Sequence, residues 1–75
     1  MTPRELRKST GKTQVALAVE TGMSQAEVSR FESREDHLLS SLRRYVEALG
    51  GTLEVWAVFD DRKVRLVIPT LEKKC

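Results

Sequence analysis

The hydrophobic pattern of this chain changes its period once, near residue 51. Before that point, apolar residues recur three or four positions apart, which is typical of short amphipathic helices. After it, apolar residues alternate with other residues, which is typical of strands. The pattern predicts four helices followed by a β-hairpin, so we expect a mainly α fold with a two-stranded C-terminal extension.

The most informative segment covers residues 13–32, where two helical patterns flank a turn. Gly22 stands where the chain leaves the first helix, and a residue without a Cβ accepts the left-handed conformation of such a turn. Ser24 and Glu27 have the spacing of a capping box that begins the second helix. The predicted inner face of the pair consists of Leu17, Ala18, Met23, Val28 and Phe31. This arrangement predicts a helix-turn-helix, the motif that places its second helix in the DNA major groove.

Two further helices complete the predicted helical part. The first is expected to begin after Thr2, with Pro3 at its first position, and to stop near Thr10. A later apolar repeat predicts a helix over residues 39–49, which two glycines end. We therefore expect residues 1–51 to form one DNA-binding domain.

The alternating part of the chain predicts a β-hairpin over residues 52–69. Two apolar runs flank a polar turn, and Pro69 ends the second run. We expect Phe59 to pair with Val64. Seven apolar residues then share one face, which is predicted to cover the helices: Leu53, Val55, Ala57, Phe59, Val64, Leu66 and Ile68. Residues 70–75 are expected to form a mobile tail.

The other face of the hairpin is also apolar, because it carries Trp56, Val58 and Val67. A two-stranded ribbon is marginally stable by itself, and an exposed apolar face favours association. We therefore predict a homodimer joined by the C-terminal strands, with the fourth helix as a further candidate contact. The hairpins would pair edge to edge, pack face on face or exchange strands. A monomer with a partly exposed Trp56 is the alternative. The predicted dimer contacts are Leu53, Val55, Trp56, Val58 and Val67.

Composition changes this picture only slightly. The chain has 75 residues, with 13 Lys or Arg and 11 Asp or Glu, so its formal net charge of +2 does not by itself predict binding to nucleic acid. Basic residues do gather just before the helix pair and at its end, where they can contact phosphates. The single cysteine, Cys75, excludes an internal disulfide. We expect no membrane span and no signal peptide, and hence a cytoplasmic protein.

In a dimer, two recognition helices related by a two-fold axis would read a palindromic site with half-sites roughly 34 Å apart. Gln25 can form a bidentate pair with adenine, and Arg30 with guanine. The predicted base contacts are Gln25, Ala26, Ser29 and Arg30. The predicted phosphate contacts, at helix N-termini and on the flanking polar residues, are Lys12, Thr13, Gln14, Ser24, Ser33 and Arg34. For each residue the alternative is a helix cap or a solvated side chain.

Residues 13–32 resemble the helix-turn-helix of the Xre/Cro family of phage repressors, in their alanine, their glycine and the two apolar positions of the second helix. Residues 31–51 look like those of Xre-type antitoxins, notably the HipB and HigA kinds, whose domain often ends in a β segment. The resemblance covers about residues 6–68 and implies a lambda-repressor-like four-helix domain. The chain departs from the family at Leu38, where a serine or threonine commonly caps the fourth helix.

The same resemblance implies a dimeric repressor of its own operon, of bacterial or phage origin. It also implies a toxin partner, either a HipA-like kinase or a RelE-fold ribonuclease. Two alternatives stay open: a protein-interaction module whose hairpin binds a partner, and a plain phage-type repressor without a toxin. The operator sequence does not follow from the residues.

An enzymatic function is not predicted. The single histidine, His37, lies in a polar connection, and no nucleophile is placed to complete a triad with it. The sequence has neither metal-ligand spacing nor a phosphate-binding glycine loop. We therefore expect no cofactor and no metal.

Overall fold

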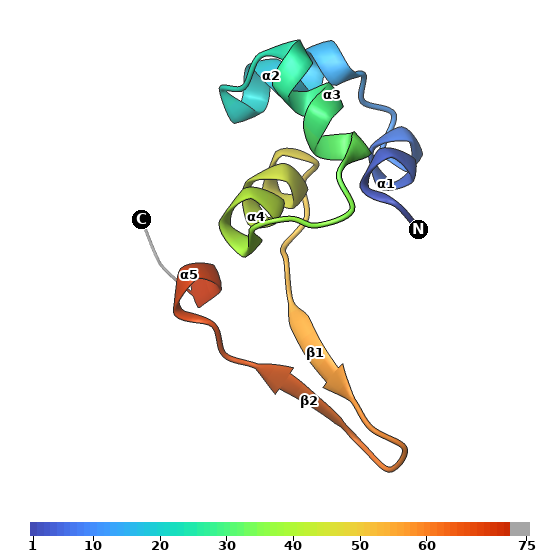
Figure 1. The fold of residues 1–75 in the computed structure, drawn as a ribbon, viewed down its shortest axis with the longest axis vertical. Coiled ribbons are helices and arrows are strands. Elements are labelled where there is room, and N and C mark those ends of the chain that lie inside the picture. The colour runs from blue at the N-terminus through green and yellow to red at the C-terminus, as the bar shows by residue number, and fades with distance from the viewer. Residues whose placement is uncertain (73–75) are drawn as a thin grey trace.

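The structure is a computed structural model, and it describes residues 1–72. The helices α1 to α4 form a helical body, from which a two-stranded hairpin projects (Figure 1). Along the chain the elements are α1 (Pro3–Ser9), α2 (Gln14–Thr21), α3 (Gln25–Ser33), α4 (Leu39–Ala48), β1 (Val55–Val58), β2 (Lys63–Leu66) and α5 (Pro69–Glu72). The predicted fold class, mainly helical with a C-terminal hairpin, is confirmed.

The first three helices begin at side-chain caps. The Thr2 hydroxyl accepts the Glu5 N–H at 3.2 Å, and the Glu5 carboxylate accepts the Thr2 N–H at 2.7 Å. Ser24 and Glu27 form the same reciprocal pair at the start of α3, at 3.1 and 2.8 Å. The Thr13 hydroxyl accepts a backbone N–H from the first turn of α2 at 3.1 Å. Each cap satisfies N–H groups that a helix start leaves without partners, so the predicted starts are confirmed.

The turn between α2 and α3 has the predicted geometry. Gly22 ends α2 with a φ of 78°, and its N–H donates to the Ala18 carbonyl at 3.0 Å. The start of α4 is different, because Leu38 stands at its N-cap and makes no side-chain hydrogen bond there. That helix ends at Ala48, one residue before the predicted end. Packing therefore has to hold the start of α4 in place of a cap.

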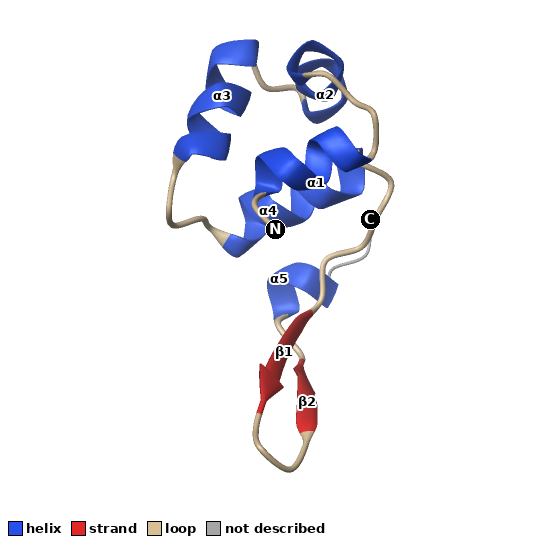
Figure 2. Ribbon diagram, turned by 90° about the vertical axis from the view of Figure 1, so that its right-hand side faces the viewer, coloured by secondary structure: helices blue, strands red, loops and turns tan. Residues whose placement is uncertain are grey.

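The core lies where α2, α3 and α4 meet. Leu17, Val28 and Tyr45 are fully buried, and Ala18 and Phe31 are nearly so. The rings of Phe31 and Tyr45 stack with their centroids 4.7 Å apart. Figure 2 shows α2 and α3 on the side of the body away from the hairpin. The predicted inner face of the helix pair is confirmed, with Met23 packed against its edge.

The hairpin has a tighter turn than the sequence suggested. Ala57 lies opposite Val64, so the prediction that Phe59 pairs with Val64 is wrong. The Phe59 N–H donates to the Arg62 carbonyl at 2.8 Å, which leaves residues 60–61 as the loop. Because the register differs by two residues, every side chain stays on its predicted face.

The apolar face of the hairpin does not cover the helices, contrary to prediction. The side chains of Phe59, Val64 and Leu66 on that face are 50%, 40% and 43% exposed. Residues 51–54 leave the end of α4 without secondary structure and carry both strands past the helical body (Figures 1 and 2). The face is therefore free to contact another molecule.

Part of the expected tail is helical. The turn α5 lies against α4, and the Leu71 N–H donates to the Ile68 carbonyl at 2.8 Å. Residues 70–72, the start of the predicted mobile tail, are therefore part of α5. The rest of that predicted tail, with Cys75, lies outside the described residues.

Candidate nucleic-acid interface

One side of α3 carries all four predicted base-contact residues. Gln25, Ala26 and Arg30 are exposed, and Ser29 is partly buried. Offsets of one, four and five residues place these side chains along one side of a helix. Val28 lies on the opposite, buried side. The structure therefore brings the four residues together on a polar surface near the start of α3.

Glu27 lies next to this surface, but its carboxylate belongs to the cap of α3. Hydrogen bonds from the backbone and the side chain of Ser24 hold the pKa of Glu27 below its usual range. The positive charges of Arg30 and Arg44 act in the same direction. Glu27 is thus ionised at neutral pH and holds the first turn of α3 in shape.

The start of α2 lies beside α3 and carries Thr13 and Gln14. The first N–H groups of a helix lack partners within the helix, and the helix dipole favours an anion there. The Gln14 side chain turns inward, because its Nε2 donates to Oε1 of Glu32 at 3.0 Å. Since an amide carries two N–H groups, one can still face outward. Gln14 therefore joins the predicted phosphate site to a buried carboxylate.

Two other predicted phosphate contacts are engaged within the protein. The Lys12 ammonium donates to the Ala48 carbonyl at 2.9 Å and forms an ion pair with Glu20. The Ser33 hydroxyl donates to the Ser29 carbonyl at 3.0 Å. A phosphate contact by Lys12 or Ser33 would compete with these hydrogen bonds.

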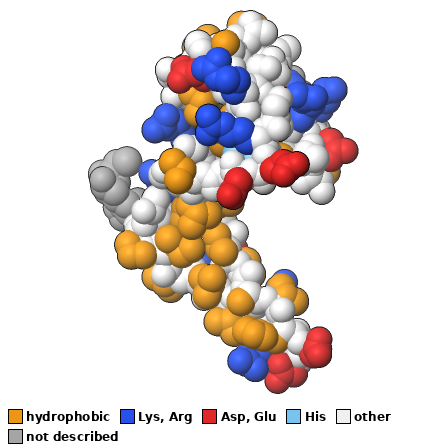
Figure 3. Space-filling view, in the orientation of Figure 1, with side chains coloured by type: hydrophobic (Ala, Val, Ile, Leu, Met, Phe, Trp, Pro, Cys, Tyr) orange, Lys and Arg blue, Asp and Glu red, His pale blue; other side chains and the backbone are white. Residues whose placement is uncertain are grey.

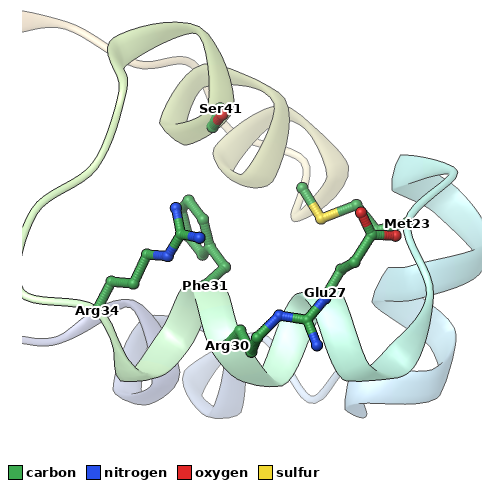
Figure 4. A pocket seen from close by; sticks show the side chains of 6 residues that line it. All are labelled: Met23, Glu27, Arg30, Phe31, Arg34 and Ser41. Atoms are coloured by element: carbon green, nitrogen blue, oxygen red, sulfur yellow. The ribbon is translucent and has the colours of Figure 1, made fainter.

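Arg30 and Arg34 line a shallow hollow of about 150 Å³ between α3 and α4. The two side chains approach it from α3 and from the end of that helix, across from Ser41 of α4 (Figure 4). Both arginines are exposed. Guanidinium groups can bind phosphate oxygens through two parallel hydrogen bonds. The Glu27 carboxylate lines the same hollow, so this edge of α3 carries two positive charges and one negative charge.

Glu32, in the last turn of α3, is buried and connects all four helices of the body. Its carboxylate accepts Arg7 Nε at 2.6 Å and the Tyr45 hydroxyl at 2.7 Å. It also accepts Gln14 Nε2 at 3.0 Å and Arg4 Nε at 3.4 Å. Donors from α1, α2 and α4 thus converge on one residue of the recognition helix.

These contacts determine the ionisation state of the Glu32 carboxyl group. Burial alone would raise the pKa of Glu32, but hydrogen bonds from Arg7, Tyr45 and Gln14, with the charge of Arg7, lower it to about 2. Burial and the hydrogen bond to Glu32 raise the pKa of Tyr45 above its ordinary value. The hydrogen bond to Glu32 likewise raises the pKa of Arg7. At neutral pH the network is therefore an ionised carboxylate, a guanidinium and a neutral phenol.

This network was not predicted from the sequence. Its one available signal was the position of Glu32, directly after Phe31 on the inward side of α3. An acidic residue on a buried helix face needs charged or polar partners, because an unpaired buried charge is very unfavourable.

The five predicted dimer contacts lie on two opposite faces of the hairpin. The strand pairing places Val55 on one face and Trp56 and Val58 on the other. Continued along the strands, it places Leu53 with Val55 and Val67 with Trp56. The five residues therefore do not form one flat surface.

The two faces of the hairpin differ in chemistry. The Trp56 face carries Lys63, whose ammonium lies 5.2 Å from the centre of the indole ring. Trp56, Val58 and Val67 on this face are 45%, 71% and 76% exposed. The opposite face is apolar along both strands. Figure 3 shows hydrophobic side chains continuing from the junction along the hairpin, whereas Lys and Arg gather mainly on the helical body.

His37 serves a structural role at the end of α3. Its Nε2 lies 2.7 Å from the Phe31 carbonyl oxygen, and the centroids of the His37 and Phe31 rings lie 4.2 Å apart. Within residues 1–72 no three His, Cys, Asp or Glu side chains are grouped as a metal would require. Across the same described residues, no helix has the length and apolar character needed to cross a membrane.

Comparison with known proteins agrees with this geometry. The model of a helix-turn-helix domain family matches residues 4–58. A putative antitoxin, HigA3 of Mycobacterium tuberculosis, is 43% identical over 65 residues, and the match covers 83% of this chain. This chain spans 60% of the length of that relative.

Two solved structures are similar to the whole arrangement. One, described as induced DNA bending by unique dimerization of HigA antitoxin, has a TM-score of 0.81 and 38% identity, covering 89% of this chain and 92% of that one. The other, described as DNA-bound antitoxin HigA3, has a TM-score of 0.77 and 40% identity, covering 87% of each chain. The chain therefore belongs to the helix-turn-helix domain family, within which it resembles the HigA antitoxins.

Proposed function

We propose that this protein is a sequence-specific DNA-binding repressor that acts as a homodimer and serves as the antitoxin of a toxin–antitoxin pair. One observation carries the proposal: α3 presents Gln25, Ala26, Ser29 and Arg30 together on one polar side, close to the start of α2. The HigA structures support it, because one is a DNA complex and the other is described by its dimerization and DNA bending.

The proposed contacts to DNA follow from side-chain chemistry. Gln25 pairs with adenine and Arg30 with guanine, while Ala26 contacts a thymine methyl group. Ser29 contacts either partner of a base pair with little discrimination. The proposed phosphate contacts are Lys12, Thr13, Gln14, Ser24, Ser33 and Arg34. Of these, Arg34 is exposed beside the recognition surface, whereas Lys12 and Ser33 would first have to leave their internal partners.

Two copies are needed for such a small surface to select one site. We assign DNA binding to residues 1–51 and dimerisation to residues 52–69, through the five hairpin contacts predicted above. A two-fold dimer presents two copies of α3 to a palindromic operator whose half-sites are roughly 34 Å apart.

The toxin partner is the part of the proposal that depends most on relatives. A HipA-like kinase and a RelE-fold ribonuclease are the two candidates, and repression of the protein's own operon completes the antitoxin role. All of these events take place in the cytoplasm and need only binding, so the proposal includes no catalytic step.

The test of DNA reading is the double substitution Gln25→Ala with Arg30→Ala. Each bidentate base contact contributes about 1–3 kcal/mol of discrimination, so we expect a loss of at least roughly 30-fold in affinity for the DNA upstream of the gene. Electrophoretic mobility shift or fluorescence anisotropy measures it. Arg62→Ala, a matched loss of an exposed arginine at the hairpin tip, should leave affinity unchanged. Unaltered operator affinity in the double variant would contradict base reading by α3.

A second candidate function is a protein-interaction module, which the exposed Trp56 and Val58 favour. The substitution Trp56→Asp distinguishes dimerisation through the hairpin from binding of a different protein. We expect monomers in light scattering, because a carboxylate in an apolar contact is strongly disfavoured, together with weaker operator binding. If this variant remains a dimer, Trp56 lies outside the dimer contact and its face is available to a different protein.

A further inference from the structure

A groove of about 680 Å³ opens on the side of the helical body from which the hairpin departs. Pro3 and Leu6 of α1 form one wall, and Leu42 and Val46 of α4 form another. Leu53, in the segment that leads to β1, completes the lining. All five side chains are partly buried, so an apolar surface large enough for several side chains is left open.

The hairpin carries the matching surface. On the face that holds Val55 and Ala57, the pairing adds Val64 and Leu66 from β2. Phe59, at the turn, continues this face. We call these five residues the arm face. It has no charged side chain, and within its own chain it extends away from the helices (Figures 1 and 2).

We propose that, in the dimer, the arm face of each copy lies in the groove of the other copy. This inference rests on the proposed homodimer and states which surfaces it joins. A two-fold exchange matches the geometry because one chain supplies both an open groove and an uncovered arm face in equal number. The groove is concave, and the hairpin projects from the helical body (Figure 1).

A further observation favours a second copy of this chain as the occupant. Leu53 lines the groove and leads directly into β1, which carries part of the arm face. In each copy the two proposed contact surfaces therefore adjoin each other.

The experiment uses two variants of the full chain that damage opposite halves of the contact. Leu6→Glu places a carboxylate in the groove, and Leu66→Glu places one on the arm face. Each should raise the dimer dissociation constant by about 100-fold or more, because an unpaired charge is then buried against apolar groups. Sedimentation velocity measures the dimer fraction. Val19→Glu, the same change at an exposed apolar position on α2, is the matched control and should dimerise normally.

Mixing the two variants gives the decisive result. In a mixed dimer the intact arm of the Leu6→Glu chain meets the intact groove of the Leu66→Glu chain, so one contact of the two is restored. We expect the equimolar mixture to regain dimers that neither variant forms alone. Such a recovery also shows that both chains are folded, because an unfolded chain could not supply either surface.

The following outcomes would overturn the inference without contradicting the proposed function. If Leu6→Glu dimerises normally, or if mixing restores nothing, the arm face does not occupy the groove. Should Leu6→Glu fail to fold by circular dichroism, Val46→Glu on the opposite wall replaces it. Dimers of Leu6→Glu alongside monomers of Trp56→Asp leave hairpin dimerisation intact and reject the exchange. A groove that binds another protein while both variants still dimerise would likewise reject it.

Discussion

Glu32 fixes the position of the recognition helix α3 within the helical body. The carboxylate accepts from Arg4, Arg7, Gln14 and Tyr45, which lie 28, 25, 18 and 13 residues away along the chain. A fully satisfied buried network fixes one arrangement of the elements that contribute to it. The side of α3 that we propose reads bases is therefore positioned by a contact on its opposite side.

This network also shows what the sequence could not reveal at the residue scale. Local spacing was enough to predict the caps at Thr2, Thr13 and Ser24, because a cap involves residues three apart. The partners of Glu32 come together only after α1, α2 and α4 have packed against α3. Arg7 taken singly resembles a solvated surface charge, and the one local signal for Glu32 is its place next to Phe31 on the inward side of α3.

The charge of Glu32 leads to a prediction about pH. The pKa is about 2 in the folded protein, below the ordinary value of 4.5. The folded state therefore binds fewer protons than the unfolded state in this range, so the contribution to stability is complete above about pH 4.5 and is lost as the pH falls toward 2. Urea unfolding followed across this range should show stability decreasing with acid.

The matching variant is Glu32→Gln, which leaves Arg7 without its carboxylate. Removal of one partner of a buried ion pair costs about 3–5 kcal/mol, so this variant should be much less stable at neutral pH. It should also lose most of the dependence between pH 2 and 4.5. An unchanged acid dependence would mean that other carboxylates cause it.

At the scale of elements, the helices were more predictable than the hairpin. Gly22 and the Ser24–Glu27 box carry local information that fixes the turn and the start of α3. The hairpin register depends on the turn, and the polar run from residue 60 to 63 permits both a two-residue and a four-residue loop. The structure forms the shorter loop, closed by the Phe59 N–H. The side-chain alternation was nevertheless correct, because both loops preserve it.

The cap of α3 allows a prediction at this scale. Ser24→Ala removes the acceptor for the Glu27 N–H, and the loss of such an N-cap costs about 0.5–2 kcal/mol. We expect lower stability in chemical unfolding and weaker operator binding, since the first turn of α3 carries Gln25. Ser24→Gly should cost only a few tenths of a kcal/mol. Equal losses in both variants would contradict a capping role for the hydroxyl.

At the scale of the whole molecule, the helical body and the hairpin differ in how far they bury their apolar side chains. The body encloses its own core around Leu17, Val28 and Tyr45. The hairpin leaves apolar side chains exposed on both faces, whereas the alternating pattern predicted exposure of the Trp56 face alone. Its direction was not predictable, because that depends on the path of residues 51–54, where the predicted alternation begins but no strand forms. The expected cover over the helices failed for this reason alone.

Association should therefore be visible in thermal stability. If the hairpin surfaces are covered only in the dimer, the dimer is the stabilised species and the melting temperature depends on protein concentration. Scanning calorimetry over about a hundredfold range of concentration should show the melting temperature rising. Trp56→Asp should melt at a temperature that does not change with concentration. A concentration-independent wild type would show that the helical body unfolds independently of association.

The projecting hairpin also has a consequence for the lifetime of the protein. Proteases bind extended, exposed backbone, and the hairpin turn offers such a segment with Arg62 and Lys63 side by side. In the proposed dimer this segment is held against a second copy, so cleavage falls mainly on free protomers. When synthesis slows, dissociation enlarges the vulnerable fraction and speeds turnover. The same strands that join two copies in the proposed dimer would make the level of the protein fall more steeply than its rate of production.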